Sequence, residues 1–226
     1  MIGIVVFPGS NCEFDVESAF RELGEVSQFV SHRERELGDY KAIIIPGGFS
    51  YGDYLRSGAI ARFSPIMDAV SRYADNGGKV VGICNGFQVL TEAGLLPGAL
   101  QRNAGLKFVC GEVRVRVGTT RSALTNLMAE GEEFSLPINH FEGNYTADRA
   151  TLQDLEEHHQ VVLRYVQNPN GSANDIAGIT NREGNVVGLM PHPERAGLGF
   201  GLPGYARRML GSVLAIDSVS AVKSAR

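Results

Sequence analysis

The sequence predicts a doubly wound α/β fold, in which flanking helices cover both faces of a mostly parallel sheet. The first observation is a set of short, continuous runs of aliphatic and β-branched residues, at residues 2–7, 26–30, 42–45 and 80–83. Such runs are typical of parallel strands that are buried on both faces. The second is that helical patterns separate the runs. The order strand, helix, strand, strand, helix, strand characterises a doubly wound sheet.

Two helices are expected between these strands. Apolar positions recur at helical spacing over residues 14–23, and a glycine follows as a stop signal. The second helix is expected at residues 66–74, because Ser64 and Pro65 before it are favoured at the N-cap and first helical positions.

Beyond residue 100 the pattern changes to added antiparallel strands. Residues 109–117 alternate between apolar and polar side chains, which is typical of an antiparallel strand. A further strand is expected at residues 160–166, and a hairpin is expected from residues 176–180 and 186–190. A last helix is expected at residues 205–222. The chain contains no repeat and no linker, so residues 1–226 are assigned to a single domain.

Composition narrows the function classes. The 226 residues are 43% hydrophobic and 20% charged, an ordinary globular mixture that excludes global disorder. Lys and Arg total 21 against 25 Asp and Glu, so the formal charge of −4 disfavours nucleic-acid binding. No export signal or membrane-spanning run is found, and a cytoplasmic location is expected. The three cysteines lack the spacing of a disulfide framework or a zinc site.

Cys84 occupies the most informative position. A buried strand runs into Gly82-x-Cys84-x-Gly86 and then into a helical pattern, which is the nucleophile-elbow arrangement with sulfur in place of oxygen. Glycines are needed because side chains flanking so tight a turn would collide. The turn places Cys84 at the start of a helix, whose positive dipole end favours a thiolate. Cys12 and Cys110 lack this context, and we interpret both as core or incidental.

A nucleophilic thiolate needs a base, and the base needs an orienting group. His192 lies between two prolines directly after residues 186–190, at a strand end where catalytic groups are commonly found. A residue before a proline is pushed into an extended conformation, and side chains two positions apart in extended chain share a side. Glu194 is therefore expected beside His192. Charged surroundings indicate solvated surface for the remaining candidates His32, His158 and His159.

A glycine-rich loop, residues 46–53, follows the strand expected at residues 42–45. Its glycines let backbone N–H groups face a ligand atom, but neither a phosphate loop nor a dinucleotide fingerprint occurs in the chain. The N–H of Gly48, with that of Asn85 after the nucleophile, is therefore a candidate oxyanion hole. For the pair Gly47-Gly48 alone, a plain tight turn is the alternative interpretation.

Five segments carry a family resemblance: residues 47–56, 82–88, 94–100, 168–172 and 190–195. Together with the spacing of the cysteine and histidine segments, they resemble class I (triad) glutamine amidotransferases. More narrowly, they are similar to the family of glutaminase subunits of phosphoribosylformylglycinamidine synthase, which acts in purine biosynthesis. The resemblance runs from Gly3 to about Arg208 and so covers nearly the whole chain.

The resemblance implies roles for the catalytic candidates. Cys84 attacks the side-chain amide of glutamine, His192 passes the proton to the departing ammonia, and Glu194 holds and polarises His192. The backbone N–H groups of Gly48 and Asn85 stabilise the tetrahedral oxyanion.

The resemblance also implies contacts to glutamine from Gly47, Gln88 and His140. His140 belongs to residues 137–143, a segment that aligns with a family loop near the glutamine pocket. In that segment Asn139 and Phe141 stand where smaller residues are expected.

The partners follow from the same resemblance. In the bacterial form, two further chains complete the complex: a separate ATP-using synthetase subunit, with a small accessory subunit. Ammonia there replaces an amide oxygen of formylglycinamide ribonucleotide. ATP and Mg²⁺ are expected on the synthetase. This chain is expected to hold no cofactor and no metal, and to bind neither nucleic acid nor membrane.

Two other classes are open. A free-standing cysteine-elbow hydrolase of the γ-glutamyl or DJ-1-like type would lack the segments at residues 47–56 and 168–172. A catalytically silent scaffold protein would be free to lose Cys84, His192 or Glu194, and all three are present.

Overall fold

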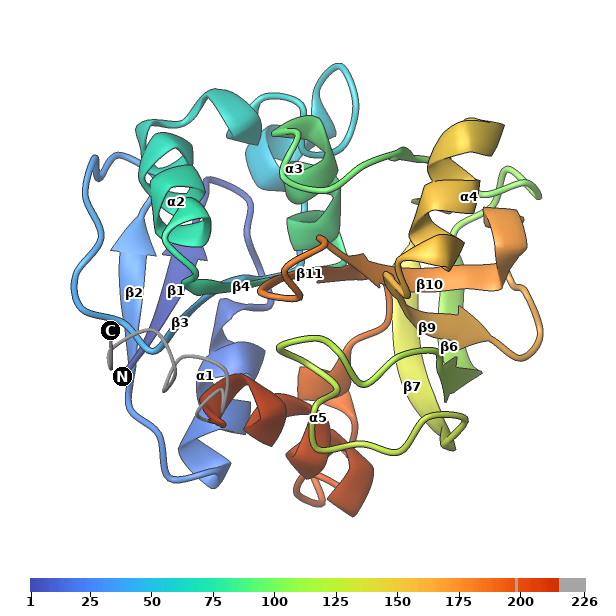
Figure 1. Cartoon of the computed structure of the whole chain (residues 1–226). Helices are drawn as coiled ribbons and strands as arrows, with labels where there is room; N and C mark the ends of the chain where they lie inside the picture. The colour runs from blue at the N-terminus through green and yellow to red at the C-terminus, as the bar shows by residue number, and fades with distance from the viewer. Residues whose placement is uncertain (198, 216–226) are drawn as a thin grey trace, which may run out of the picture.

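The computed structural model describes residues 1–197 and 199–215. Its strands are β1 (Ile2–Val6), β2 (Ser27–Ser31), β3 (Ala42–Ile45), β4 (Lys79–Ile83), β5 (Ala99–Arg102), β6 (Val109–Val117), β7 (Glu133–His140), β8 (Glu142–Thr146), β9 (Val161–Tyr165), β10 (Ile176–Thr180) and β11 (Val186–Leu189). Its helices are α1 (Glu13–Glu22), α2 (Pro65–Asp75), α3 (Asn85–Glu92), α4 (Arg149–Glu157) and α5 (Gly204–Leu214). The central sheet is nine-stranded, in the order β2-β1-β3-β4-β11-β10-β9-β6-β7, and β5 pairs with β8 in a separate sheet (Figure 1).

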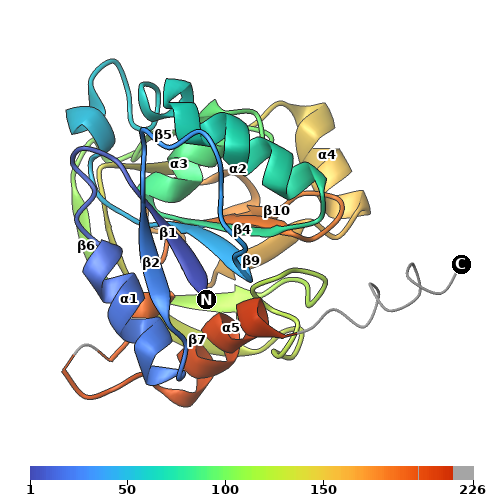
Figure 2. The ribbon, with the colours of Figure 1, turned by 90° about the vertical axis from the view of Figure 1, so that its left-hand side faces the viewer.

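One half of the central sheet is parallel. β1 pairs in parallel with β2 and β3, and β4 pairs in parallel with β3 and β11. Helices α2 and α3 cover one face of this half, and α1 and α5 cover the other (Figures 1 and 2). Every residue of β3 and β4 is buried between the two helical layers. The predicted doubly wound sheet is confirmed.

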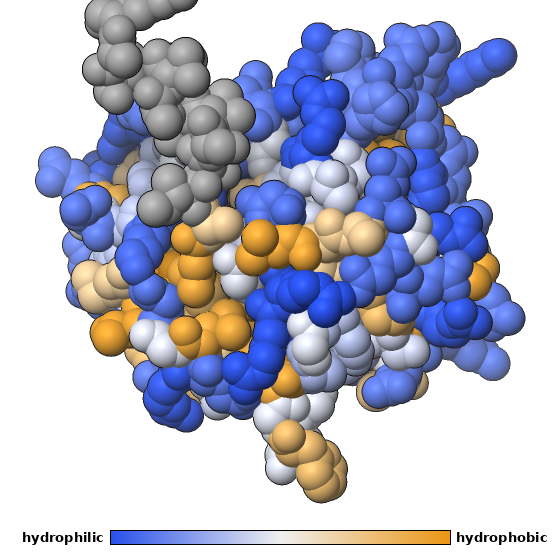
Figure 3. Space-filling view, turned by 60° about the horizontal axis from the view of Figure 1, so that its bottom comes forward, coloured by the Kyte–Doolittle hydropathy of each residue, from blue (hydrophilic) through white to orange (hydrophobic). Residues whose placement is uncertain are grey.

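The predicted burial of residues 26–30 on both faces is wrong. β2 is an edge strand of the sheet. Val26, directly before it, is 68% exposed, and Phe29 within it is 42% exposed. An edge strand has a neighbour on one side only, so helices need not cover it completely. On the face that α1 and α5 cover, hydrophobic surface groups are interrupted by hydrophilic ones (Figure 3).

The other half of the sheet is antiparallel. β11 turns back onto β10, and β9, β6 and β7 follow, each antiparallel to its neighbour. The strands predicted at residues 109–117 and 176–180 have the bounds of β6 and β10. Residues 137–143, aligned above with a loop, instead form the end of β7 and the start of β8. The proline at position 137 fits within a strand because β7 lies at the sheet edge.

Two helix ends differ from the sequence expectation. The Ser64 side chain makes no capping hydrogen bond at the start of α2; its hydroxyl lies 2.9 Å from the Tyr51 hydroxyl instead. The last helix, predicted over residues 205–222, is observed as α5 up to Leu214, and residues 216–222 lie outside the described part of the chain. Among the described residues, no helix is both long and apolar enough to cross a membrane.

Two glycines allow α3 to begin directly against the sheet. A Cβ on Gly86 would lie 2.0 Å from the carbonyl oxygen of Ile45 in β3. A Cβ on Gly82 in β4 would lie 2.6 Å from the backbone of Gly86. The collision predicted from the elbow pattern is therefore real, and it is avoided because neither residue has a side chain.

We expect Gly86→Ala to lower the free energy of unfolding by about 2–3 kcal/mol or more, because backbone atoms must move to admit the methyl group. Gly105→Ala is the matched control, since a Cβ there would meet no atom within 4 Å. It should change the free energy of unfolding by less than about 1 kcal/mol. Urea unfolding of the two variants measures both values. Equal losses would contradict the close approach of α3 to β3.

Candidate active site

Cys84 joins the end of β4 to the start of α3. Its backbone angles are φ 52° and ψ −104°, a conformation that non-glycine residues seldom adopt and that is concentrated at functional sites. The side chain is 5% exposed, and its Sγ lies 3.8 Å from the carbonyl oxygen of Asn139. The strand, strained turn and helix of a nucleophile elbow are all present.

His192 and Glu194 form a buried pair. The Nδ1 atom of His192 lies 2.6 Å from Oε1 of Glu194, and the two residues are 1% and 3% exposed. The predicted pairing is observed, but the predicted extended geometry is wrong after His192. Residues Pro193–Arg195 form a 3₁₀ turn, so Glu194 reaches His192 by folding back toward it.

The charges around His192 favour its protonated form. Burial by itself lowers the pKa of His192, but the neighbouring Glu194 carboxylate and Cys84 thiolate outweigh burial and hold that pKa above its ordinary value. Nδ1 is occupied by Glu194, whereas Nε2 is buried without a hydrogen-bond partner in the described structure. Nε2 is therefore the ring atom left to exchange a proton with a reacting group.

A cavity of about 120 Å³ opens at Cys84. Four predicted site residues line it: Cys84, Gly48, Gln88 and His140. A larger apolar hollow, of about 450 Å³, lies beside Phe14 and Phe29, but no predicted site residue lines it. The smaller cavity is the candidate substrate site because the nucleophile opens into it.

Two backbone N–H groups beside the cavity have no partner within regular structure. Ser10 and Gly48 face each other in a β-bridge held by their neighbours, with the N–H of Phe49 donating to the carbonyl of Gly9 at 2.9 Å. In an antiparallel bridge of this kind, the N–H of Gly48 points away from the partner. Asn85 is the first residue of α3, so its N–H has no acceptor inside the helix.

Of the other predicted glutamine contacts, Gln88 lines the cavity and Gly47 does not. Gly47 lies behind the site: a Cβ on it would meet His192 Cε1 at 2.8 Å and Cys12 Sγ at 3.1 Å. Gln88 lines the cavity, where its side chain accepts a hydrogen bond from Asn85 and donates one to the backbone carbonyl of Glu142.

His140 also lines the cavity and is 3% exposed. Its Nδ1 lies 3.0 Å from Oδ1 of Asn103. Burial, and secondarily the charge of His192, lower the pKa of His140 to about 4. The imidazole is therefore neutral at neutral pH.

Cys12 is a neighbour of the site that the sequence did not assign to it. Its Sγ lies within 4.8 Å of ligand atoms of His192 and Glu194, so the three residues form a set that could surround a metal ion. Burial, and next the charge of Glu194, raise the pKa of the Cys12 thiol to about 12. Because metals bind the thiolate and Glu194 already occupies Nδ1 of His192, the set is poorly prepared for a cation. Its position in the sequence could have indicated this placement. Cys12 follows β1, and the carboxyl end of β1 lies at the same edge of the parallel sheet as that of β4, where Cys84 lies.

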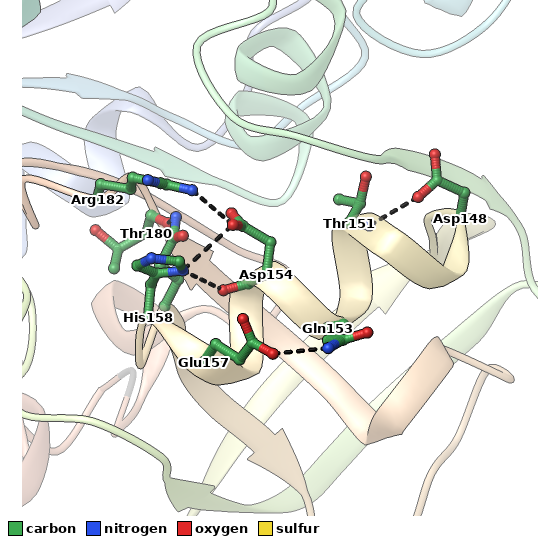
Figure 4. Close-up of polar contacts among 9 residues, drawn as sticks. Asp148, Thr151, Gln153, Asp154, Glu157, His158, Thr180 and Arg182 are labelled. Carbon is green, nitrogen blue, oxygen red and sulfur yellow. Dashed lines mark hydrogen bonds and ion pairs between the residues drawn. The ribbon is translucent and has the colours of Figure 1, made fainter.

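Of the three histidines interpreted as surface, His158 and His159 are exposed, whereas His32 is half-buried and lines the larger apolar hollow. His158 ends α4 with a side chain that is 41% exposed, and its Nδ1 lies 3.3 Å from Oδ1 of Asp154 (Figure 4). Arg182 approaches the same carboxylate at 2.5 Å. This ion pair network joins His158 and Arg182 to Asp154 at the end of α4 (Figure 4).

Comparisons with known proteins agree with this geometry. The family model described as a CobB/CobQ-like glutamine amidotransferase domain matches residues 1–213. The phosphoribosylformylglycinamidine synthase subunit PurQ of Trichormus variabilis is 57% identical over 196 residues, which cover 86% of this chain and 88% of the relative. The subunit PurQ of Rubrobacter xylanophilus is 58% identical over 195 residues, covering 86% and 89%.

Solved structures show the same similarity. A chain in the structure of PurLQS from Thermotoga maritima superposes with a TM-score of 0.85 at 42% identity, covering 94% of this chain and 96% of that one. A glutamine amidotransferase from Thermotoga maritima superposes with a TM-score of 0.56 at 16% identity, covering 98% and 84%, which shows a shared fold alone.

We expect Glu194→Gln to lower the pKa of His192, because the charge that opposes the effect of burial is removed while the shape is kept. Glutamine turnover should fall by about 100-fold or more, since the imidazolium loses its stabilising partner. The pH titration of the His192 ring signals by NMR measures the first effect. Thermal unfolding of the two proteins is the control, because it shows that both spectra are recorded on folded protein. An unchanged His192 titration would contradict the electrostatic coupling of the pair.

Proposed function

Because the chain belongs to the family of CobB/CobQ-like glutamine amidotransferase domains, we propose that it is the glutaminase subunit of a phosphoribosylformylglycinamidine synthase. It hydrolyses L-glutamine to glutamate and ammonia. The ammonia passes to an ATP-dependent synthetase subunit, which converts formylglycinamide ribonucleotide to formylglycinamidine ribonucleotide in de novo purine biosynthesis. The observation that carries the proposal is a buried, carboxylate-paired histidine that interacts with a cysteine at a strained strand-to-helix turn.

The proposed reaction is an acyl transfer through a thioester. Sγ of Cys84 bonds to the amide carbon of glutamine, and His192 gives the thiol proton to the leaving nitrogen as the carbon–nitrogen bond breaks. Water then attacks the thioester while His192 takes its proton, and glutamate leaves as the thiol is restored. Glu194 holds the ring through Nδ1, so that Nε2 faces these transfers.

The tetrahedral intermediates carry a negative oxygen. We assign its stabilisation to the N–H groups of Gly48 and Asn85, because both donors lie beside the cavity and neither is used by regular structure. A side chain at Gly48 is excluded, since its φ is 142° and a Cβ would lie 2.8 Å from the carbonyl oxygen of Gly9.

The remaining chemistry is assigned to partners. A large synthetase subunit carries ATP and Mg²⁺, a small accessory subunit completes the complex, and this chain holds neither metal nor cofactor. The complex works in the cytoplasm. Support comes from the solved relative, which is a chain of PurLQS, and from the sequence, which has no phosphate-binding loop.

A diazoketone analogue of glutamine should label Cys84 alone, because Cys84 lines the cavity where the analogue binds, whereas Cys12 lies near His192 but does not line that cavity. Peptide mass spectrometry locates the label. Cys110 is the matched control, since it is the exposed thiol and should react with iodoacetamide but not with the analogue. Cys84→Ala should abolish both labelling by the analogue and glutamine hydrolysis. Labelling of Cys12 or Cys110 by the analogue would contradict the assignment.

Adding the synthetase and its ligands should raise glutaminase turnover at least about tenfold, a change of about 1.4 kcal/mol in the barrier. Ammonia that escapes into water near neutral pH becomes ammonium, which is not nucleophilic, so hydrolysis without a docked acceptor is wasteful. The Gly47-Gly48 loop is the expected switch, because glycine can reorient an N–H at little steric cost. Glutamate release by the isolated chain and by the complex measures the ratio. A full rate in the isolated chain, unchanged by any synthetase, would favour a free-standing hydrolase.

A further inference from the structure

Two carboxylates line the Cys84 cavity together with the nucleophile. They belong to Asp53, which follows β3, and to Glu142, the first residue of β8. Among the described residues lining the cavity there is no lysine or arginine. His140 adds no positive charge, because its pKa is lowered to about 4. The lining is therefore negative at neutral pH.

Asp53 is held close to the nucleophile elbow. Its φ is 53°, and the side-chain Nδ2 of Asn85 lies 3.4 Å from its Oδ1. Burial, opposed in part by a hydrogen bond to Ser57 and reinforced by the charge of Glu142, raises the pKa of Asp53 to about 6. Its negative charge is thus incompletely compensated by the protein alone.

Glu142 is more fully partnered. Its Oε2 accepts a hydrogen bond from the backbone N–H of Ser57 at 3.1 Å, and the guanidinium of Arg102 lies 3.8 Å from Oε1. Arg102 is 68% exposed in its side chain, so it stands at the rim where water screens it. A cation that enters the cavity would meet Asp53 and Glu142 with less competition from solvent.

An independent observation concerns His140, which lines the cavity. Oδ1 of Asn103 accepts the N–H of Gly143, so it is an acceptor, and Nδ1 of His140 must donate to it. The other ring nitrogen, Nε2, is then an unprotonated acceptor. It is buried and has no partner in the described structure. A buried acceptor without a partner is costly, and because His140 lines the cavity, we infer that an N–H group of the bound substrate is its partner.

Building on the glutaminase function proposed above, we propose that Asp53 and Glu142 form the subsite that binds the α-ammonium group of glutamine. When the amide carbon is placed at Cys84, the ammonium at the other end of the substrate is its only cation. The two carboxylates are the acidic groups of the same cavity, and one ammonium can donate to both. The subsite therefore selects an amino-acid amide over a plain carboxamide of the same length.

The test compares two substrates in the assembled complex of this chain with its synthetase and accessory subunits. Glutamine carries the ammonium, and glutaric acid monoamide lacks it but has the same reacting amide. The variants are Asp53→Asn and Glu142→Gln, which keep an acceptor oxygen for Asn85 and Ser57. The matched control is Asp75→Asn, because Asp75 is an exposed carboxylate at the end of α2.

Asp53→Asn should lower kcat/KM for glutamine by about tenfold or more, mainly through KM, as expected for loss of a charge-assisted hydrogen bond. Glu142→Gln should act in the same direction. Hydrolysis of the monoamide should change by less than about threefold in both variants, and Asp75→Asn should change neither substrate. Equal losses for both substrates would show that Asp53 and Glu142 only support the fold, and would overturn the proposal. Unchanged kinetics in both variants would overturn it as well.

The two proposals fail in different ways. A wild-type complex that hydrolyses neither substrate contradicts the glutaminase function itself. A wild-type complex that hydrolyses glutamine, but whose preference for glutamine over the monoamide survives both substitutions, contradicts the ammonium subsite alone. Thermal unfolding of each variant confirms that a loss of activity is measured on folded protein.

Discussion

The close approach of α3 to the sheet is the constraint on which the site depends. Because Gly86 has no side chain, the first turn of α3 lies directly on the carbonyl of Ile45, where a Cβ would be 2.0 Å away. The chain must therefore turn within a single residue after β4, and Cys84 takes the strained conformation that this requires. The same turn makes Asn85 the first residue of α3 and brings Gln88, one turn later, to the cavity, so one packing contact positions three site groups.

Electrostatics then decides what the buried groups can do. A histidine that is 1% exposed would ordinarily be neutral, since burial penalises its charge. Glu194 reverses that preference for His192, whereas burial, and secondarily the charge of His192, lower the pKa of His140 to about 4. Two buried imidazoles of the site are thus set to opposite charge states. One can exchange protons during catalysis, and the other can only accept a hydrogen bond.

The sequence predicted the elements that have strong local patterns. Strands 42–45, 109–117 and 176–180 were placed correctly because continuous or alternating apolar runs fix both their length and their faces. β7 was missed because Pro137 interrupts its pattern, and only its place at the sheet edge makes that proline acceptable. Cys84, His192 and Glu194 could be found because their motifs are local. Asp53 could not be found in this way. Its approach to the cavity depends on a left-handed backbone conformation of the loop, and an aspartate at this position does not predict that conformation.

The mixed character of the sheet brings the distant parts of the site together. β11 is parallel to β4 and antiparallel to β10, so the hairpin returns the chain to the edge where Cys84 lies. Leu189 pairs with Ile83, and the N–H of Cys84 donates to the carbonyl of Leu189 at 2.7 Å. His192 follows Leu189 by three residues, so the register of β11 fixes where the histidine lies relative to Cys84. A one-residue slip of β11 would turn its side chains to the opposite face, so the Val186–Leu189 pairing both fills the core and sets the distance between base and nucleophile.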